Sequence, residues 1–141
     1  ALRASDRDGD HWVLNGSKMY ITNGVLADLV FVAARTDQSA KGSRGLSIFA
    51  VERGTPGFRV GRALGKQGWL ASDTAELVFE DCRVPASHLV GAENGGFHAI
   101  MRNFQTERIA LGAMAIGHCQ TALKLTLEWV MGRGVCEWLG W

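Results

Sequence analysis

The hydrophobic pattern of this chain changes its period at Gly95-Gly96, and this change limits the possible folds more than any other feature of the sequence. Before it, short apolar runs alternate with glycines and with both prolines of the chain, a pattern typical of strands joined by turns. After it, from Gly96 to Arg133, there is no proline, and apolar residues recur at helical spacing. The sequence therefore predicts a mainly β segment followed by one long C-terminal helix.

We expect about six strands before the change of period, folded as an antiparallel β-sandwich or barrel. Asn15-Gly16 is predicted to be a hairpin turn between the first two strands, because both residues tolerate the positive φ of a type I′ turn. The run 29–34 is continuously apolar, which favours a strand buried on both faces, whereas residues 1–10 are expected to be irregular. The six expected strands are 11–14, 17–24, 29–34, 46–51, 58–61 and 74–84.

The expected helix is too long for a small domain to cover. At 1.5 Å per residue, a helix from Gly96 to Arg133 would extend over ~55 Å. We therefore expect it to bend or to leave much of its surface for another partner. Its apolar stripe is formed by Phe97, Met101, Phe104, Leu111 and Ala115.

The composition argues against several functional classes. The chain has 141 residues, of which 47% are apolar and 21% charged, as in a globular domain with its own core. A net charge of +1 gives no reason to expect nucleic acid or an anionic membrane as a partner, and no apolar run approaches the ~20 residues needed to span a bilayer. Cys82, Cys119 and Cys136 are widely spaced, so we expect reduced thiols and no metal site.

Four blocks of the sequence resemble, in the same order, the acyl-CoA dehydrogenase family. They are residues 15–24, 45–52, 72–85 and 107–110, and the resemblance extends over roughly residues 1–133. The family usually has tryptophan where this chain has Tyr20. The resemblance implies a middle β-domain at residues 1–92, the first helix of a C-terminal helical bundle at 93–133, and a tail at 134–141 that departs from the family pattern.

The resemblance implies an FAD-dependent oxidoreductase that dehydrogenates the α,β carbon–carbon bond of acyl-CoA thioesters, in fatty acid or branched-chain acyl-CoA oxidation. The implied cofactor-binding residues are Tyr20, Ile21 and Thr22, with the Tyr20 ring beside the isoalloxazine and the Thr22 hydroxyl near flavin N5. A donor there would stabilise charge that arrives as hydride. The strand pattern alone predicts that Tyr20 and Thr22 share one face, and an ordinary Tyr-Thr pair in a sheet is the alternative.

Glu107 is the candidate catalytic base. Its neighbours on the helix are mostly apolar, so an inward-facing Glu107 would be desolvated and its pKa raised, as a base near neutral pH requires. The residues alone leave open a surface glutamate beside Arg108. Residues 105–108 resemble the isovaleryl- and long-chain-type members, which place the base at this position of the helix.

Ser43 and Arg44, in an expected loop, lie where family members contact the CoA portion of the substrate. A solvated loop charge is the alternative for Arg44. Further substrate-side candidates are His98, Gln105 and Arg108. The resemblance also implies an electron-transfer flavoprotein as acceptor, a homo-oligomeric full-length parent, and a bacterial cytoplasm or mitochondrial matrix, since no targeting segment is expected at the start.

We expect the chain to be a fragment, because the family's N-terminal helical domain and the later part of its bundle have no counterpart in the sequence. On its own it should have little or no activity. Two alternatives stay open. One is a non-catalytic β-module that oligomerises through its helix, and the other is an acyl-CoA oxidase, which passes electrons to oxygen.

Overall fold

The computed structural model of the chain describes residues 2–6 and 9–133. The chain divides into two compact units, Ala1–Ala99, which holds the strands, and Ile100–Trp141, which holds most of the helix. The expected tail at 134–141 lies outside the described residues. The elements are β1 Leu2–Asp6, β2 Gly9–Thr22, β3 Leu29–Arg35, β4 Leu46–Glu52, β5 Phe58–Ala63, β6 Thr74–Pro85, the 3₁₀ turn η1 Ala86–His88, β7 Leu89–Val90 and α1 Gly96–Gly132.

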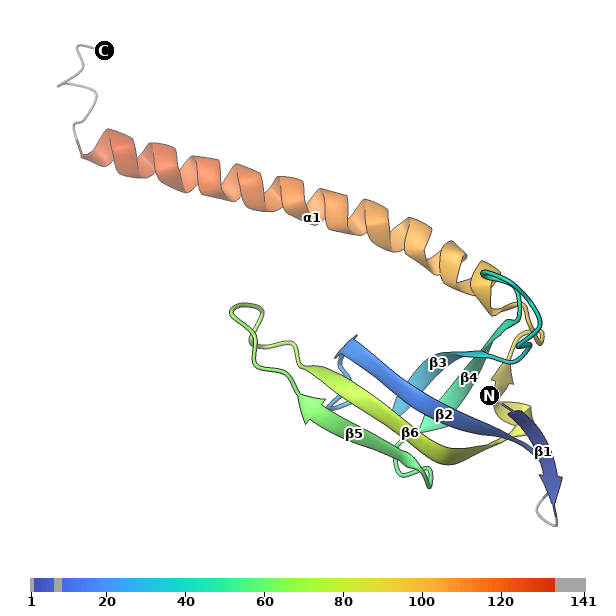
Figure 1. Ribbon diagram of the computed structural model, residues 1–141. Coiled ribbons are helices and arrows are strands. Elements are labelled where there is room, and N and C mark those ends of the chain that lie inside the picture. The colour runs from blue at the N-terminus through green and yellow to red at the C-terminus, as the bar shows by residue number, and fades with distance from the viewer. Residues whose placement is uncertain (1, 7–8, 134–141) are drawn as a thin grey trace. The chain divides into compact units, whose positions relative to one another are not determined.

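The strands of the first unit form two antiparallel sheets (Figure 1). The larger sheet has the order β1-β2-β6-β5, and the smaller has the order β3-β4-β7. Every paired neighbour runs antiparallel. The predicted fold class, mainly β followed by a long helix, is confirmed.

The predicted hairpin at Asn15-Gly16 is wrong. Residues 9–22 form one continuous strand, β2, which pairs along its length with β6, from His11 opposite Pro85 to Thr22 opposite Thr74. The register shifts between Leu14 and Gly16, so Asn15 marks a bulge in the ladder. The Asn15 side chain stabilises this bulge, because its Oδ1 accepts a hydrogen bond from the backbone N–H of Asp81 at 2.7 Å.

Two further strand predictions need correction. Residues 2–6, expected to be irregular, form β1 and pair with β2, and Leu89–Val90 adds the short β7. Strand β3 is buried on one face only, because Val30 and Val32 face the core whereas 67% of Phe31 is exposed. A continuous apolar run thus does not distinguish a strand covered on both faces from one that leaves apolar side chains uncovered.

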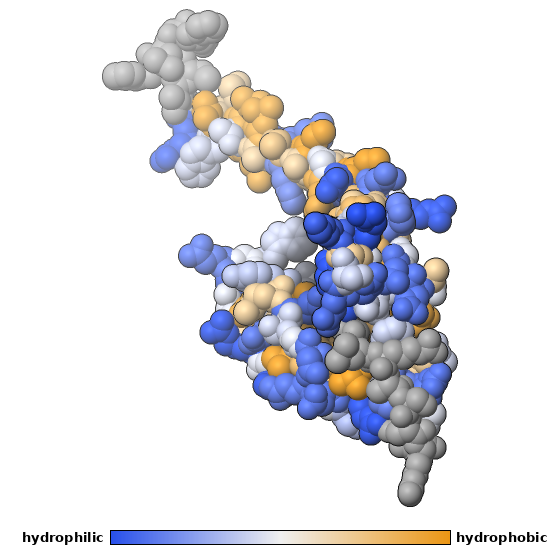
Figure 2. Space-filling view, turned by 45° about the vertical axis from the view of Figure 1, so that its right-hand side comes forward, coloured by the Kyte–Doolittle hydropathy of each residue, from blue (hydrophilic) through white to orange (hydrophobic). Residues whose placement is uncertain are grey.

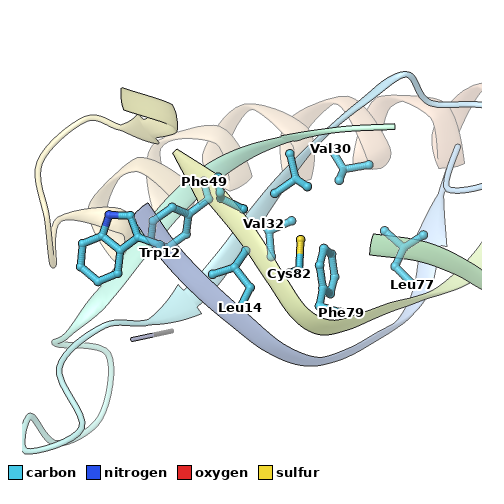
Figure 3. Close-up of a cluster of buried hydrophobic side chains, with 10 residues drawn as sticks. Trp12, Leu14, Val30, Val32, Phe49, Leu77, Phe79 and Cys82 are labelled. Carbon is cyan, nitrogen blue, oxygen red and sulfur yellow. The ribbon is translucent and has the colours of Figure 1, made fainter. Parts of the chain in front are cut away.

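The core of the first unit lies between the two sheets (Figure 3). Phe49 of β4 is fully buried, and its ring centroid lies 5.3 Å from that of Trp12 on β2. Cys82 of β6 is also fully buried, and burial raises the pKa of its thiol, which favours the protonated form. The buried residues of the cluster are Trp12, Leu14, Val30, Val32, Phe49, Val51, Leu77, Phe79, Cys82 and Val84.

The second unit consists, in its described part, of a single helix. The 37 residues of α1 confirm the long helix predicted from residue 96 onward. Much of its apolar side-chain surface is exposed, including 76% of Ile109 and 61% of Leu111, and Figure 2 shows apolar side chains at the surface along the helix. No stretch of helix among the described residues is long and apolar enough to cross a membrane.

Replacing Phe49 with alanine should destabilise the first unit by about 3–5 kcal/mol, because it empties the centre of a close-packed core. Urea unfolding followed by far-UV circular dichroism measures the change. Phe31→Ala is the matched control, since it removes the same side chain from an exposed position and should change the free energy of unfolding by only about 0.5 kcal/mol. Equal losses for the two variants would contradict this description of the core.

Candidate functional site

Tyr20 lies at the second register shift of the β2–β6 ladder, which is a bulge in β2. Lys18 is opposite Leu77 and Ile21 is opposite Ala75, so two residues of β2 face one residue of β6. Tyr20 takes up the extra length with φ of 60°, a left-handed conformation that is unfavourable for a bulky residue. Its side chain is 77% exposed. The bulge therefore holds an aromatic ring at the surface in a strained backbone conformation.

Ile21 and Thr22 complete the predicted cofactor segment. Ile21 is partly buried against the core, whereas Tyr20 and Thr22 on either side of it are exposed. The two exposed residues nevertheless line different hollows. Tyr20 lines a hollow of about 350 Å³ with Arg62 and the end of β5, whereas Thr22 lines one of about 380 Å³ beside β3. The structure thus does not bring the ring and the hydroxyl into one hollow.

The turn after Thr22 is held by hydrogen bonds to both kinds of backbone group. Asp73 Oδ2 accepts from the N–H groups of Val25 at 2.6 Å and Leu26 at 3.1 Å. From the other side, the Arg53 guanidinium donates to the carbonyl of Ala27 at 3.0 Å and to that of Val25. These bonds fix the end of β2, and with it Thr22. Sequence analysis missed both residues, because each binds backbone groups far away along the chain and no local pattern marks such a contact.

Lys18 is another residue that sequence analysis missed. It belongs to the larger sheet, but its Nζ donates to the carbonyl of Ala33 in the smaller sheet at 2.7 Å. Lys18, Val32 and Ala33 line both the hollow beside Thr22 and a neighbouring one of about 280 Å³. The lysine therefore ties the two sheets together at the boundary between the two hollows.

Although they line different hollows, the exposed groups of the 20–22 segment are each of a kind that suits a flat cofactor with a polar edge, such as a flavin. The uncovered Tyr20 ring offers a flat apolar surface, and the Thr22 hydroxyl offers a donor that has no hydrogen-bond partner among the described residues. Metal chemistry has no comparable donor set in the described ranges, where no group of three or more His, Cys, Asp or Glu residues is placed to hold an ion.

Ser43 and Arg44 lie in the loop between β3 and β4, as predicted, and both are exposed. The loop closes through Gly45, whose carbonyl accepts from the N–H groups of Thr36 at 2.9 Å and Asp37 at 3.3 Å. Gly45 has φ of +78°, and a Cβ added there would come within 2.6 Å of the Asp37 carbonyl oxygen. Only glycine fits this position without a shift of the backbone.

The base of this loop is connected to the start of α1 by a buried hydroxyl. Ser47 is fully buried, and its Oγ accepts from the N–H of Asn94 at 2.8 Å and lies 2.7 Å from the Thr36 hydroxyl. Thr36 Oγ1 in turn donates to Asn94 Oδ1 at 2.7 Å. With Ser47 donating to Thr36, the single Thr36 proton points to the nearer of two acceptors, since the Gly45 carbonyl oxygen also lies 3.3 Å from Thr36 Oγ1. A Cβ at Gly96 would meet the Leu46 carbonyl at 2.9 Å, so the chain passes close to β4 as the helix begins.

The remaining candidates lie on α1 and are exposed. His98 belongs to the first unit, whereas Gln105, Glu107 and Arg108 belong to the second. Glu107 accepts a hydrogen bond from the side-chain amide of Asn103 at 2.5 Å. The apolar surroundings that the sequence predicts for an inward-facing Glu107 are not supplied by the described residues of its own unit. Its role as a base therefore stays a prediction.

The Asp37 carboxylate organises the loop that carries Ser43 and Arg44. The hydroxyl of Ser39, the N–H groups of Ser39 and Ala40, and nearby Arg35 hold the pKa of Asp37 below its usual range, against a smaller opposing effect of burial. A lowered folded-state pKa means that the stabilisation is fully present above the unfolded-state pKa. It is lost as pH falls through the folded-state value.

Asp37→Asn should therefore lower stability near neutral pH, and its difference from the wild type should vanish in acid. Urea unfolding at a series of pH values measures this difference, and carbon-13 NMR of the carboxyl gives the pKa directly. Ser39→Ala removes the largest stabilising contact and should move the pKa of Asp37 back towards its ordinary value. An ordinary pKa for Asp37 in the wild-type chain would contradict this assignment.

Comparison with known proteins agrees with this fold. The model of the acyl-CoA dehydrogenase middle domain matches residues 1–82, and that of the C-terminal domain matches residues 94–137. Mitochondrial long-chain specific acyl-CoA dehydrogenase of Mus musculus is 47% identical over 128 residues, which are 90% of this chain and 30% of that protein. Mitochondrial isovaleryl-CoA dehydrogenase of Pongo abelii is 42% identical over 127 residues, which are 89% of this chain and 30% of that protein.

A solved structure extends the comparison to three dimensions. The crystal structure of a putative acyl-CoA dehydrogenase from Mycobacterium smegmatis matches with a TM-score of 0.69 at 52% identity, over 79% of this chain and 29% of that one. This chain spans about 30% of the length of the curated relatives it matches. Sequence, fold and order of domains agree, and the chain belongs to the acyl-CoA dehydrogenase family.

Proposed function

We propose that this chain is part of an FAD-dependent acyl-CoA dehydrogenase that removes hydrogen from the α- and β-carbons of an acyl-CoA thioester. The observation that carries the proposal is the bulge of β2, which holds the Tyr20 ring uncovered next to the exposed Thr22. A strained aromatic residue at the surface is typical of a functional site rather than of a core. Membership of the acyl-CoA dehydrogenase family supports FAD as the ligand of this surface.

The proposed cofactor-binding residues are Tyr20, Ile21 and Thr22. A solved structure described as the FAD complex of PigA is 36% identical to this chain over 67% of its residues, with a TM-score of 0.60. FAD, when bound, supplies the acceptor for the β-hydrogen. In this proposal the Tyr20 ring stacks beside the flat ring system, Ile21 anchors the segment to the core, and the Thr22 hydroxyl donates a hydrogen bond to the cofactor.

Glu107 is the proposed base that takes the α-proton. In the described unit it is exposed and bonded to Asn103, which lies one helical turn earlier and can fix the carboxylate rotamer. Raising its basicity to the range that the reaction needs requires apolar groups from elsewhere in the full-length protein. The relatives named above are of the long-chain and isovaleryl types, which supports the position predicted for the base.

The CoA portion of the substrate is the proposed ligand of Ser43 and Arg44. Both are exposed in a loop whose backbone is held by internal hydrogen bonds, and a cationic side chain there suits a phosphate group. His98, Gln105 and Arg108 remain further substrate-side candidates. All three are exposed on α1.

We infer an electron-transfer flavoprotein as the electron acceptor, and an oxidase that reduces oxygen is the alternative. A solved structure of the electron transferring flavoprotein of Acidaminococcus fermentans is 48% identical to this chain over 71% of this chain, which supports a link to that system. Oxygen consumption by the full-length enzyme distinguishes the two acceptors.

The exposed apolar residues of α1 favour a second candidate, in which the chain oligomerises through its helix without catalysis. Light scattering on the flavin-free chain tests this candidate. A mass that rises with concentration supports it, and a constant monomer mass contradicts it.

Tyr20→Ala should reduce FAD retention by the full-length enzyme about tenfold or more, because it removes the stacking surface. The measurement is the ratio of flavin to protein absorbance after gel filtration. Tyr20→Trp keeps a flat ring and is the matched control, so it should retain FAD. Full retention by Tyr20→Ala would contradict the assignment.

The 141-residue chain by itself should show little or no turnover with an artificial acceptor.

Glu107→Gln should lower kcat of the full-length enzyme about 10²–10⁴-fold while KM changes little, since the amide fills the same space but cannot accept the proton. Glu128→Gln is the control on the same helix. Glu128 forms an exposed pair with Lys124 at 3.8 Å, and its loss should change kcat by less than about twofold. A Glu107→Gln enzyme with wild-type kcat would exclude Glu107 as the base.

A further inference from the structure

Arg35, the last residue of β3, donates hydrogen bonds to three carbonyls of the loop that follows it. Its Nη1 lies 3.0 Å from the carbonyl oxygens of Ala40 and Arg44, and its Nη2 lies 2.8 Å from that of Gly42. These three acceptors come from alternate residues over the half of the loop that contains Ser43. Arg35 as a whole is half-buried. One side chain therefore sets the path of the backbone from residue 40 to residue 44.

Asp37 is the acidic residue of this loop, and its printed hydrogen bonds go to groups of the loop itself. The carboxylate of Asp37 is used inside the loop, where its Oδ1 accepts from the N–H of Ser39 at 2.9 Å and from the Ser39 hydroxyl at 2.6 Å. A third bond, from the N–H of Ala40, is 3.3 Å long. Asp37 thus fixes the first half of the loop through N–H groups, and Arg35 fixes the second half through carbonyls.

This division leaves the outer cations of the loop available. Lys41 and Arg44 are exposed, and no hydrogen bond or ion pair with the residues the structure describes engages either charged head. The Arg44 backbone is nevertheless held, because its carbonyl is one of the three that Arg35 binds. A long side chain on a fixed backbone loses less conformational entropy when it binds a ligand than one on a mobile loop.

We propose that Arg35 is a positioning residue for the CoA portion of the substrate. It does not touch the ligand, but it holds the 40–44 backbone so that Ser43 and Arg44 present their side chains to it. This inference rests on the proposed function, in which Ser43 and Arg44 contact CoA. It goes further by assigning an effect on substrate affinity to a residue at the end of β3 that holds the loop.

The chemistry of the guanidinium explains how the single residue Arg35 can bind three loop carbonyls. Its planar fork has five N–H donors in fixed directions, so it can serve three carbonyls at once without rearrangement. The lysine ammonium has three donors on a flexible chain and can satisfy part of this set. Methionine has a similar length and no donor, and would leave all three carbonyls to water.

The test uses the full-length enzyme with an acyl-CoA substrate, and it compares Arg35→Met, Arg35→Lys and Arg44→Met. Arg35→Met should raise KM about tenfold with kcat within about twofold, because binding is weakened and the chemical step is not. Arg35→Lys should give an intermediate KM. Arg59→Met, which removes an arginine from an exposed pair with Glu80, is the matched control and should leave both constants unchanged.

The double variant Arg35→Met/Arg44→Met separates positioning from a general loss of structure. If Arg35 acts through Arg44, the two effects on KM are non-additive, and the double variant resembles the more impaired single one. Isothermal titration with free coenzyme A should show the same pattern without turnover. Additive effects, an unchanged KM for Arg35→Met, or a parallel fall in kcat and thermal stability would each overturn the inference.

The same experiment distinguishes failure of this inference from failure of the proposed function. If the wild-type enzyme turns over acyl-CoA and the Arg35→Met variant has the same kinetic constants, the positioning role alone is overturned. A wild-type enzyme that neither turns over acyl-CoA nor binds coenzyme A overturns the proposed function, and the role of Arg35 falls with it.

Discussion

The pairing of β2 with β6 is the interaction on which the rest of the first unit depends. This ladder runs from His11 opposite Pro85 to Thr22 opposite Thr74, and the two strands supply most of the buried side chains that the larger sheet contributes to the core. Its two irregularities are ordered features of the ladder rather than defects, because one is held by Asn15 and the other brings Tyr20 to the surface. The position of the candidate cofactor segment is therefore fixed by the same hydrogen bonds that hold the sheet together.

The loops next to the candidate site are stabilised by one recurring arrangement. An aspartate accepts from the N–H groups of a loop while an arginine donates to its carbonyls: Asp73 and Arg53 do this after β2, and Asp37 and Arg35 do it after β3. Each pair of side chains satisfies donors and acceptors that a short loop cannot satisfy itself. These hydrogen bonds restrict the backbone of irregular segments before any ligand binds. A binding site with a restricted backbone loses less conformational entropy on binding.

The sequence predicted the fold class, the long helix and the strands β4, β5 and β6, because their signals are local: alternation, turn residues and a proline-free run at helical spacing. It failed where the outcome depends on a partner strand. Asn15-Gly16 fits a hairpin turn locally, yet β6 pairs with both sides of it, so the same two residues lie within one strand, at a shift in its register with β6. The apolar run of β3 likewise could not reveal that Phe31 would be left exposed. Among the site residues, motifs led to Tyr20 and Glu107. Arg35, Arg53 and Lys18 were missed because they donate hydrogen bonds to backbone carbonyls, either distant in sequence or within a loop. No motif marks such contacts.

The left-handed conformation of Tyr20 has a consequence for how this segment can change. At φ of 60° a β-carbon costs about 1 kcal/mol or more, a cost that glycine would avoid. The substitution that most relaxes the backbone is thus the one that deletes the aromatic ring. At this position stability favours glycine, whereas the proposed cofactor contact favours an aromatic residue. A screen for thermostable variants of this chain would therefore tend to select against the ring.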